Sequence, residues 1–252
     1  MKSKMIIVVA MFVLAASVLP AAADVIVNVN AVSQGQTATQ QFVIPSSANL
    51  SDWTLPSSTN LLTPDGVYLG SLTSMAVKAD NEAYVNLFFG VIAGSSDTTF
   101  SVTATNTGAT GSGPFTPIVN PTAFATAGIT LTSDFDGATI TGLFPGAQVY
   151  EARYTGLGGN TLYADLVNGL SITPDKTVTN SDRLPALGVQ TIADTVSGIS
   201  LAYDFTLSAF DQASGTGRFE VDAATPEPAT MSLLVMGGMA VLARRKRTMK
   251  SN

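Results

Sequence analysis

The sequence predicts an all-β protein, an antiparallel β-sandwich of jelly-roll-like type with at most one or two short helices. Short stretches alternate apolar and polar residues, which is typical of half-buried strands. Clusters of Gly, Ser, Asn, Asp and Pro separate those stretches, as turns do. Only 12% of the residues are charged, and the abundant Thr and Ser suit exposed strand faces. Regularly spaced short strands of this kind are typical of sandwiches and barrels.

The first half of the chain begins with the clearest strand. In Val25–Val32, Val25, Val27 and Val29 fall on one face, whereas Asn28 and Asn30 fall on the other. Further strands are predicted at Gln40–Ile44, Val67–Val77, Ala83–Ile92 and Thr98–Thr105. Thr107–Pro117 is the most loop-like stretch and predicts a long connection or a boundary between sheet halves.

The second half continues the strand pattern with one interruption. Strands are predicted at Gly128–Thr132, Ala138–Leu143 and Gln148–Tyr154. In Asn160–Leu170, leucines recur every four residues, Asn160 suits a helix cap and Gly169 a helix end, which favours a short helix over a strand. Thr173–Gly188 is predicted to be a polar loop. Ile199–Phe210 and Gly217–Val221, joined by Asp211–Thr216, are predicted to form an antiparallel hairpin at the edge of the sandwich.

Met1–Ala23 has the layout of a secretory signal peptide. Lys2 and Lys4 form a basic start, Met5–Leu19 is apolar, and small residues precede Asp24. Cleavage is therefore predicted after Ala23, with Ala21 and Ala23 as the small residues of the cleavage site and Asp24 as the first residue of the mature chain.

The other terminal segment, residues 225–252, has three consecutive parts. Pro226, Glu227 and Pro228 hold the chain extended. The apolar run Met231–Ala243 spans about 20 Å as a helix, against a hydrocarbon core near 30 Å. A cationic block follows, which is costly to move through lipid and stays on the cytoplasmic side; its residues are Arg244, Arg245, Lys246 and Arg247. A short buried helix is the alternative reading of the apolar run.

This order resembles the PEP-CTERM sorting signal of exported bacterial proteins. The resemblance implies a recognition motif at Pro226, Glu227 and Pro228, a transient transmembrane helix at residues 229–243 and a basic stop at Arg244–Arg247. It also implies cleavage by an exosortase, a membrane protease, and transient anchoring in the inner membrane before release to the cell surface or medium. The chain thus divides into a signal peptide (1–23), a secreted domain (24–224) and a sorting signal (225–252).

Composition restricts the chemistry of the secreted domain. Seven of the 12 basic residues and one of the 18 acidic residues lie in the two terminal segments, which leaves a net charge of −12. Such a domain repels phosphate backbones, so no nucleic-acid partner is expected. The chain contains no cysteine and no histidine. It therefore folds without disulfides and lacks the usual zinc ligands and histidine-dependent triads.

Two acidic stretches are weak candidates for metal binding. Asp134 and Asp136 precede Gly137 in a fragment like the start of a calcium loop, although the later acidic ligand is missing. A plain Asp-Gly hairpin turn explains these residues equally well. Asp80 with Glu82 is weaker still. No cofactor is predicted with confidence, and structural calcium is the one candidate.

Two further functions are open for the secreted domain. Glycoside hydrolysis needs paired carboxyl groups, for which Glu82, Glu151 and Glu220 are the candidates, but exposed strand faces normally carry such residues. Sugar binding needs exposed aromatic rings, for which Trp53, Tyr150 and Tyr154 are the candidates, whereas burial in the core is the favoured interpretation.

The sequence therefore predicts a non-enzymatic, exported protein of the cell surface or biofilm matrix, a role implied by the PEP-CTERM resemblance. A carbohydrate-binding adhesin is the alternative, and a polysaccharide-acting enzyme is less favoured.

Overall fold

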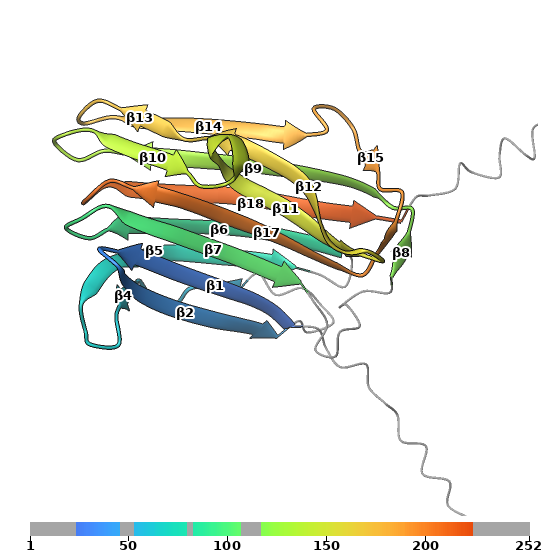
Figure 1. Cartoon of the computed structure of the whole chain (residues 1–252), viewed down its shortest axis with the longest axis horizontal. Helices are drawn as coiled ribbons and strands as arrows, with labels where there is room; N and C mark the ends of the chain where they lie inside the picture. The colour runs from blue at the N-terminus through green and yellow to red at the C-terminus, as the bar shows by residue number, and fades with distance from the viewer. Residues whose placement is uncertain (1–23, 46–52, 80–82, 107–116, 224–252) are drawn as a thin grey trace, which may run out of the picture.

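The structure, a computed structural model, describes residues 24–45, 53–79, 83–106 and 117–223 of the 252-residue chain. These residues form two eight-stranded antiparallel sheets that pack face to face, with contacts between β17 and β18 and between β6 and β7 (Figure 1). The all-β prediction is confirmed, and the arrangement is that of a β-sandwich. The jelly-roll-like connectivity stays a prediction.

Sheet A has the strand order β12-β11-β17-β7-β1-β2, with β10 paired to β17 and β13 paired to β10. Its strands are β1 (Asp24–Ser33), β2 (Gln36–Pro45), β7 (Thr98–Asn106), β10 (Ala138–Gly142), β11 (Gln148–Gly156), β12 (Gly159–Asn168), β13 (Leu170–Ile172) and β17 (Gly198–Leu207). A 3₁₀ turn, η1 (Pro145–Ala147), lies between β10 and β11.

Sheet B has the order β14-β9-β18-β6-β5-β3, with β15 beside β9 and β4 beside β5. Its strands are β3 (Trp53–Thr54), β4 (Thr59–Leu62), β5 (Tyr68–Ala79), β6 (Ala83–Ala93), β9 (Thr122–Thr132), β14 (Thr177–Leu184), β15 (Gln190–Thr191) and β18 (Gln212–Asp222). Two short strands, β8 (Ile118–Val119) and β16 (Thr195–Val196), form a separate pair.

Strict alternation places the apolar side chains between the sheets. Along β6, Val85, Leu87 and Phe89 are buried, whereas Asn86 and Phe88 face outward. An aromatic group fills the centre of the core, where the Phe89 ring lies 5.0 Å from Tyr203. Full burial of each such side chain contributes about 1.5–3 kcal/mol, so this interface between the sheets holds the sandwich together.

The predicted helix at Asn160–Leu170 is wrong, because residues 159–168 form strand β12. The turn after Gly156 folds β12 back onto β11, and their ladder runs from Gly156↔Gly159 to Gln148↔Asn168. Tertiary pairing therefore overrides the four-residue leucine spacing. Leu166 is buried but Leu162 is 40% exposed, since a register shift opposite Ala152 and Arg153 interrupts the alternation.

The predicted loop at Thr173–Gly188 is also wrong in its central part, which forms strand β14 along the edge of sheet B. Threonine pairs link this strand to β9: the hydroxyls of Thr130 and Thr179 lie 2.9 Å apart, and those of Thr132 and Thr177 lie 3.1 Å apart. An edge strand buries few side chains, which explains its weak apolar signal.

The predicted hairpin near the end of the domain is wrong in its pairing. β17 lies in sheet A between β11 and β7, whereas β18 lies in sheet B between β9 and β6. The hairpin turn considered at Asp134–Gly137 is wrong for the same reason. The strands on its two sides do not pair, because β9 belongs to sheet B and β10 to sheet A. Both turns cross from one sheet to the other at the left end of Figure 1.

Among the described residues, no helix is long and apolar enough to cross a membrane. The predicted signal peptide, the loop at 107–116 and the transmembrane segment at 229–243 lie outside those residues.

Candidate functional site

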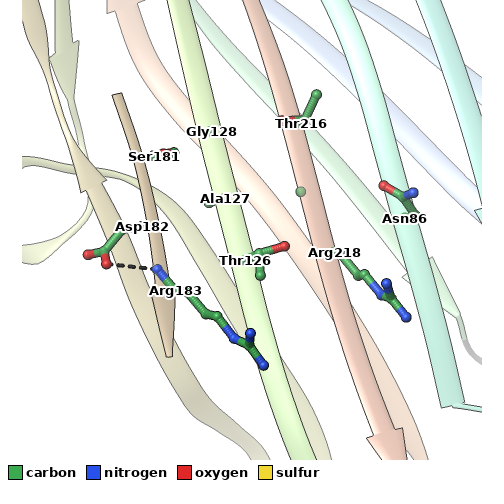
Figure 2. A pocket seen from close by; sticks show the side chains of 10 residues that line it. Asn86, Thr126, Ala127, Gly128, Ser181, Asp182, Arg183, Thr216 and Arg218 are labelled. Carbon is green, nitrogen blue, oxygen red and sulfur yellow. Dashed lines mark hydrogen bonds between the residues drawn. The ribbon is translucent and has the colours of Figure 1, made fainter. Parts of the chain in front are cut away.

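The outer face of sheet B carries a row of polar side chains in register across five strands. Arg183 pairs with Thr126, Thr126 with Arg218, Arg218 with Asn86, and Asn86 with Lys78. We call these five residues the cross-strand row. Figure 2 shows its first four members on neighbouring strands, with the side chains of Arg183 and Arg218 on either side of Thr126.

The row gathers most of the positive charge of the domain. Outside the two terminal segments the chain has five basic residues, and Arg183, Arg218 and Lys78 are three of them. Neighbouring strands lie about 4.7–4.9 Å apart, so cations two strands apart are separated by about 10 Å. Basic side chains thus recur at regular intervals along this face, where Glu220 pairs with Arg218 and Asp182 lies next to Arg183.

Aromatic rings hold the two guanidinium groups in place. The Cζ atoms of Arg183 and Arg218 each lie 4.9 Å from the centroid of the Phe124 ring, and Arg218 also lies 5.0 Å from the Tyr84 ring. Cation–π contacts of this kind orient a planar guanidinium. Glu220 accepts a hydrogen bond of 2.9 Å from Nε of Arg218, which fixes that side chain further.

Both guanidinium groups retain hydrogen-bonding capacity. Arginine has five N–H donors. Within the part of the chain that the structure describes, Arg183 donates from Nη2 to the Gly188 carbonyl at 2.8 Å, and Arg218 uses Nε and Nη2 for Glu220. The remaining donors belong to side chains that are exposed or partly exposed, and guanidinium donors match the forked acceptor geometry of a carboxylate.

Two depressions follow the row. The larger, of about 560 Å³, has Ala127, Gly128 and Gly217 among its lining residues and is bordered by Arg183 and Arg218. The second, of about 310 Å³, is lined by residues of β5 and β6, including Ala76 and the 40% exposed Phe88. Asn86 lines both, so the two depressions adjoin at β6, and we call them together the groove.

Two tyrosines of sheet A support this groove from below. The buried hydroxyl of Tyr203 lies within hydrogen-bonding distance of the carbonyls of Gly128 and Thr216, and that of Tyr150 donates to the Arg218 carbonyl at 3.3 Å. Burial raises the pKa of both phenols well above the usual value, so both stay protonated donors. The backbone beneath the groove is therefore fixed to the core.

The weak calcium candidates Asp134 and Asp136 meet a third carboxylate, Asp211. One carboxylate oxygen from each lies within 4.8 Å of the others, because the two turns that cross between the sheets lie together. We call these residues the three-aspartate cluster. The pKa of Asp136 is raised, first by a hydrogen bond with the Asp134 side chain and then by the Asp134 charge.

Part of the cluster is already used within the protein. The buried carboxylate of Asp211 accepts hydrogen bonds from the Asp134 amide at 3.1 Å and from the Ser208 hydroxyl, and Asp134 accepts one from the Asp136 amide at 3.2 Å. Calcium requires six to eight oxygen ligands, and the cluster supplies part of that number. Structural calcium therefore stays a prediction. Asp80 and Glu82 lie outside the described residues.

The carboxylates considered for catalysis do not meet. Glu151 lies on β11 of sheet A, whereas Glu220 lies on β18 of sheet B beside Arg218, and Glu82 lies outside the described residues. Glu151 is 5% exposed and accepts a 2.7 Å hydrogen bond from Arg153. Its cross-strand neighbour Asp165 has a raised pKa, caused first by burial and then by the Glu151 charge.

The aromatic residues considered for sugar binding belong to the core. Tyr150 is fully buried, so it cannot contact a sugar at the surface, and its candidacy as a sugar-binding residue is wrong. Tyr154 and Trp53 are partly buried against the core, and Trp53 packs on Phe42 with ring centroids 5.4 Å apart. Core packing, the interpretation the sequence favoured, is thus confirmed. The sequence did not place Arg183 in the groove, because Thr173–Gly188 was interpreted as a loop, although Val178 and Leu184 partly alternate with Thr179, Ser181 and Arg183. The other lining residues have no spacing along the chain that would bring them together.

The predicted sorting residues, Pro226–Pro228 and Arg244–Arg247, lie outside the described residues, as do Ala21 and Ala23; Asp24 begins β1. Comparison with known proteins addresses the sorting signal. A family model for the PEP-CTERM protein-sorting motif matches residues 224–247. No curated protein matches the chain.

Among solved structures, the chain is similar to a protein of infectious bursal disease virus, Gx strain, at 13% identity, covering 92% of this chain and 76% of that chain with a TM-score of 0.20. Similarity to the T13 particle of the same virus has 12% identity, 89% and 66% coverage and a TM-score of 0.18. Likeness at these TM-scores carries no argument about fold or function.

The sorting motif is therefore the finding that indicates how this protein is delivered. It indicates an extracellular protein that is exported, anchored transiently in the membrane and sorted by an exosortase. This chain contains a PEP-CTERM protein-sorting motif at residues 224–247, as its prolines, apolar run and cationic block predicted.

Proposed function

We propose that this protein is a non-catalytic structural component of the cell surface or biofilm matrix, delivered by its PEP-CTERM motif. The observation that carries the proposal is the match of that motif to residues 224–247. The signal peptide predicted at residues 1–23 supports the same route, because a sorting motif read at the membrane is useful only on an exported chain.

The sandwich suits such a role. Its core joins two eight-stranded sheets without any disulfide, since the chain has no cysteine. The domain therefore needs no oxidising step to fold outside the cell, and its stability does not depend on the redox state of the surroundings.

A second candidate is a carbohydrate-binding adhesin. The groove along the cross-strand row favours it, because the groove joins an apolar floor to fixed hydrogen-bond donors, the combination that ligand sites use. The two candidates are compatible, since a matrix protein retained by polysaccharide is also an adhesin.

Intact-mass analysis of the protein from surface, medium and membrane fractions tests the delivery proposal. In a host with its exosortase, we expect a mature chain that begins at Asp24 and ends near Pro226–Pro228. In a host without the exosortase, we expect a longer chain that retains Met231–Asn252 in the membrane fraction. The same full-length mass in both hosts would contradict the proposal.

A matched variant separates recognition from anchoring. Replacing Pro226 and Pro228 by Ala removes the extended motif but leaves the apolar run and Arg244–Arg247 in place. We expect this protein to reach the membrane and to remain unprocessed there. Normal processing would show that the prolines are not part of the recognition motif.

A further inference from the structure

We propose that the cross-strand row binds an acidic polysaccharide, whose carboxylates pair with Arg183, Arg218 and Lys78. The choice of a polysaccharide rests on the proposed delivery to the surface or matrix. The pairing with carboxylates rests on the geometry of sheet B alone.

Basic residues are unevenly distributed over the domain. Three of the five basic residues outside the terminal segments fall on one register line of one sheet face. The fourth, Arg153, pairs with Glu151 on the other sheet, and the fifth, Lys176, precedes β14. A domain with a net charge of −12 has thus gathered most of its basic residues where two depressions run. Two carboxylates lie on the same face, Asp182 in the lining of the larger depression and Glu220 paired with Arg218. The fit to an anionic ligand therefore depends on the donors that Arg183 and Arg218 keep beyond these contacts.

The guanidinium groups of Arg183 and Arg218 are preorganised by an aromatic ring. Phe124 contacts both Arg183 and Arg218, at 4.9 Å each, so the two side chains lie over one ring. Ordering two long side chains in advance lowers the entropic cost of binding. Their remaining donors match the forked acceptor geometry of a carboxylate.

The basic residues of the row are regularly spaced across the sheet. Positive charges recur at every second strand, about 10 Å apart, which suits an extended polymer whose acidic units repeat along its axis. The partly apolar floor formed by Gly128, Phe88 and Ala76 accepts the C–H faces of sugar rings between those charges. A polymer laid across β14 to β5 therefore meets both charge and apolar surface.

The overall negative charge of the domain does not prevent this contact. Repulsion between exposed charges is screened beyond about 10 Å at 0.1 M salt, whereas the row acts at hydrogen-bonding distance. Binding is consequently expected to weaken as salt rises, because each contact is an exposed ion pair.

The test measures binding of the processed protein, purified from the surface or medium fraction, to alginate and polygalacturonate by calorimetry. Neutral dextran and double-stranded DNA serve as comparison polymers. We expect binding to both acidic glycans, none to dextran, and weaker binding to DNA. Equal affinity for dextran would overturn the role of charge, and tighter binding to DNA would overturn the choice of a glycan.

Single substitutions locate the site. Arg183→Gln is expected to weaken alginate binding roughly tenfold, because a hydrogen bond to a charged group is lost. Lys176→Gln is the matched control, since it removes one positive charge from an exposed residue outside the row. Its affinity should stay within about twofold of the unmodified protein. Equal weakening by both substitutions would show that only net charge matters and would refute the site.

Two further variants extend the map along the row. Arg218→Gln and Lys78→Gln are each expected to weaken binding in the same direction as Arg183→Gln. Arg218→Gln also frees Glu220, so its thermal unfolding is measured alongside. Arg183 is exposed on an edge strand, and Arg183→Gln therefore keeps the test decisive even where Arg218→Gln is unstable. Unchanged alginate binding by Arg183→Gln would overturn the proposal.

The binding proposal and the delivery proposal can be refuted independently of each other. A protein retained in the cell that still binds alginate through Arg183 contradicts the delivery proposal and leaves the groove in place. A correctly processed surface protein that binds no acidic glycan contradicts the groove and leaves delivery in place.

Discussion

Replacing Gly215 by Ala tests how closely the two sheets pack. Gly215 lies on β18 against the aromatic group of the core. A Cβ added there would lie 2.4 Å and 2.5 Å from Cε1 and Cζ of Phe89, and 3.2 Å from Cε1 of Tyr203. Carbon atoms in contact are about 3.5–4.0 Å apart. The Phe89 ring would therefore have to move by about 1 Å.

The ring has little room for that movement. Phe89 is fully buried, and its ring centroid lies 5.0 Å from that of Tyr203 and 6.3 Å from that of Phe205. Overpacking of a core costs about 1–3 kcal/mol. The lower backbone entropy of unfolded Ala returns about 0.4–1 kcal/mol. We expect a net loss of about 2 kcal/mol, from the severe end of the overpacking range.

Thermal and urea unfolding measure this loss. For a domain of this size, about 2 kcal/mol lowers Tm by about 4–8 °C. Gly158→Ala is the matched control, because nothing lies within 4 Å of a Cβ added at Gly158. That substitution should leave Tm unchanged or raise it slightly. Combining Gly215→Ala with Phe89→Leu makes space and should cost less than the sum of the single changes. A Gly215→Ala protein as stable as the unmodified one, or an equal loss in Gly158→Ala, would refute the reasoning.

Three other changes have defined outcomes. Asp165→Asn should stabilise the fold at pH 7 by up to about 1 kcal/mol, a small gain because the Asp165 side chain is only partly buried and solvent screens its charge. The raised pKa of Asp165 means that its ionised form opposes folding, so this gain disappears below the ordinary pKa of 3.8. Urea unfolding of both proteins on either side of that pH measures the difference, and a gain that does not change with pH would contradict the reasoning. Tyr203→Phe should lower the free energy of unfolding by about 1–3 kcal/mol, because buried carbonyls lose their donor; a protein with unchanged urea midpoint would argue against those bonds. Calcium at about 100 times its Kd should raise the free energy of unfolding by about 2.7 kcal/mol if it binds the three-aspartate cluster, and a Tm that responds to neither calcium nor chelator would rule that binding out.

Local patterns were sufficient for the strands whose side chains alternate strongly. Val25, Val27 and Val29 identified β1, and similar alternation identified β6 and β7, because a strand buried on one face must repeat with period two. The sorting motif was equally readable, since its prolines, apolar run and cationic block act as a linear signal that needs no fold. These features depend on neighbours in the chain, which the sequence displays directly.

Sheet membership depended on contacts between distant segments. β17 and β18 follow one another in the chain, yet they belong to different sheets, because each finds its partners among strands far away in sequence. The same crossing brought Asp211 to Asp134 and Asp136. Turn residues specify that the chain reverses, and packing of the two apolar faces decides onto which sheet it returns.

The sequence by itself determined the strand-forming segments, the absence of cysteine and histidine chemistry, and the delivery signal. Only the tertiary structure decided that Arg183, Arg218 and Lys78 share one row, because register across five strands joins residues 78 to 218 through four separate ladders. A cross-strand row has no spacing along the chain. It exists only when hydrogen bonding between strands fixes which residues lie side by side.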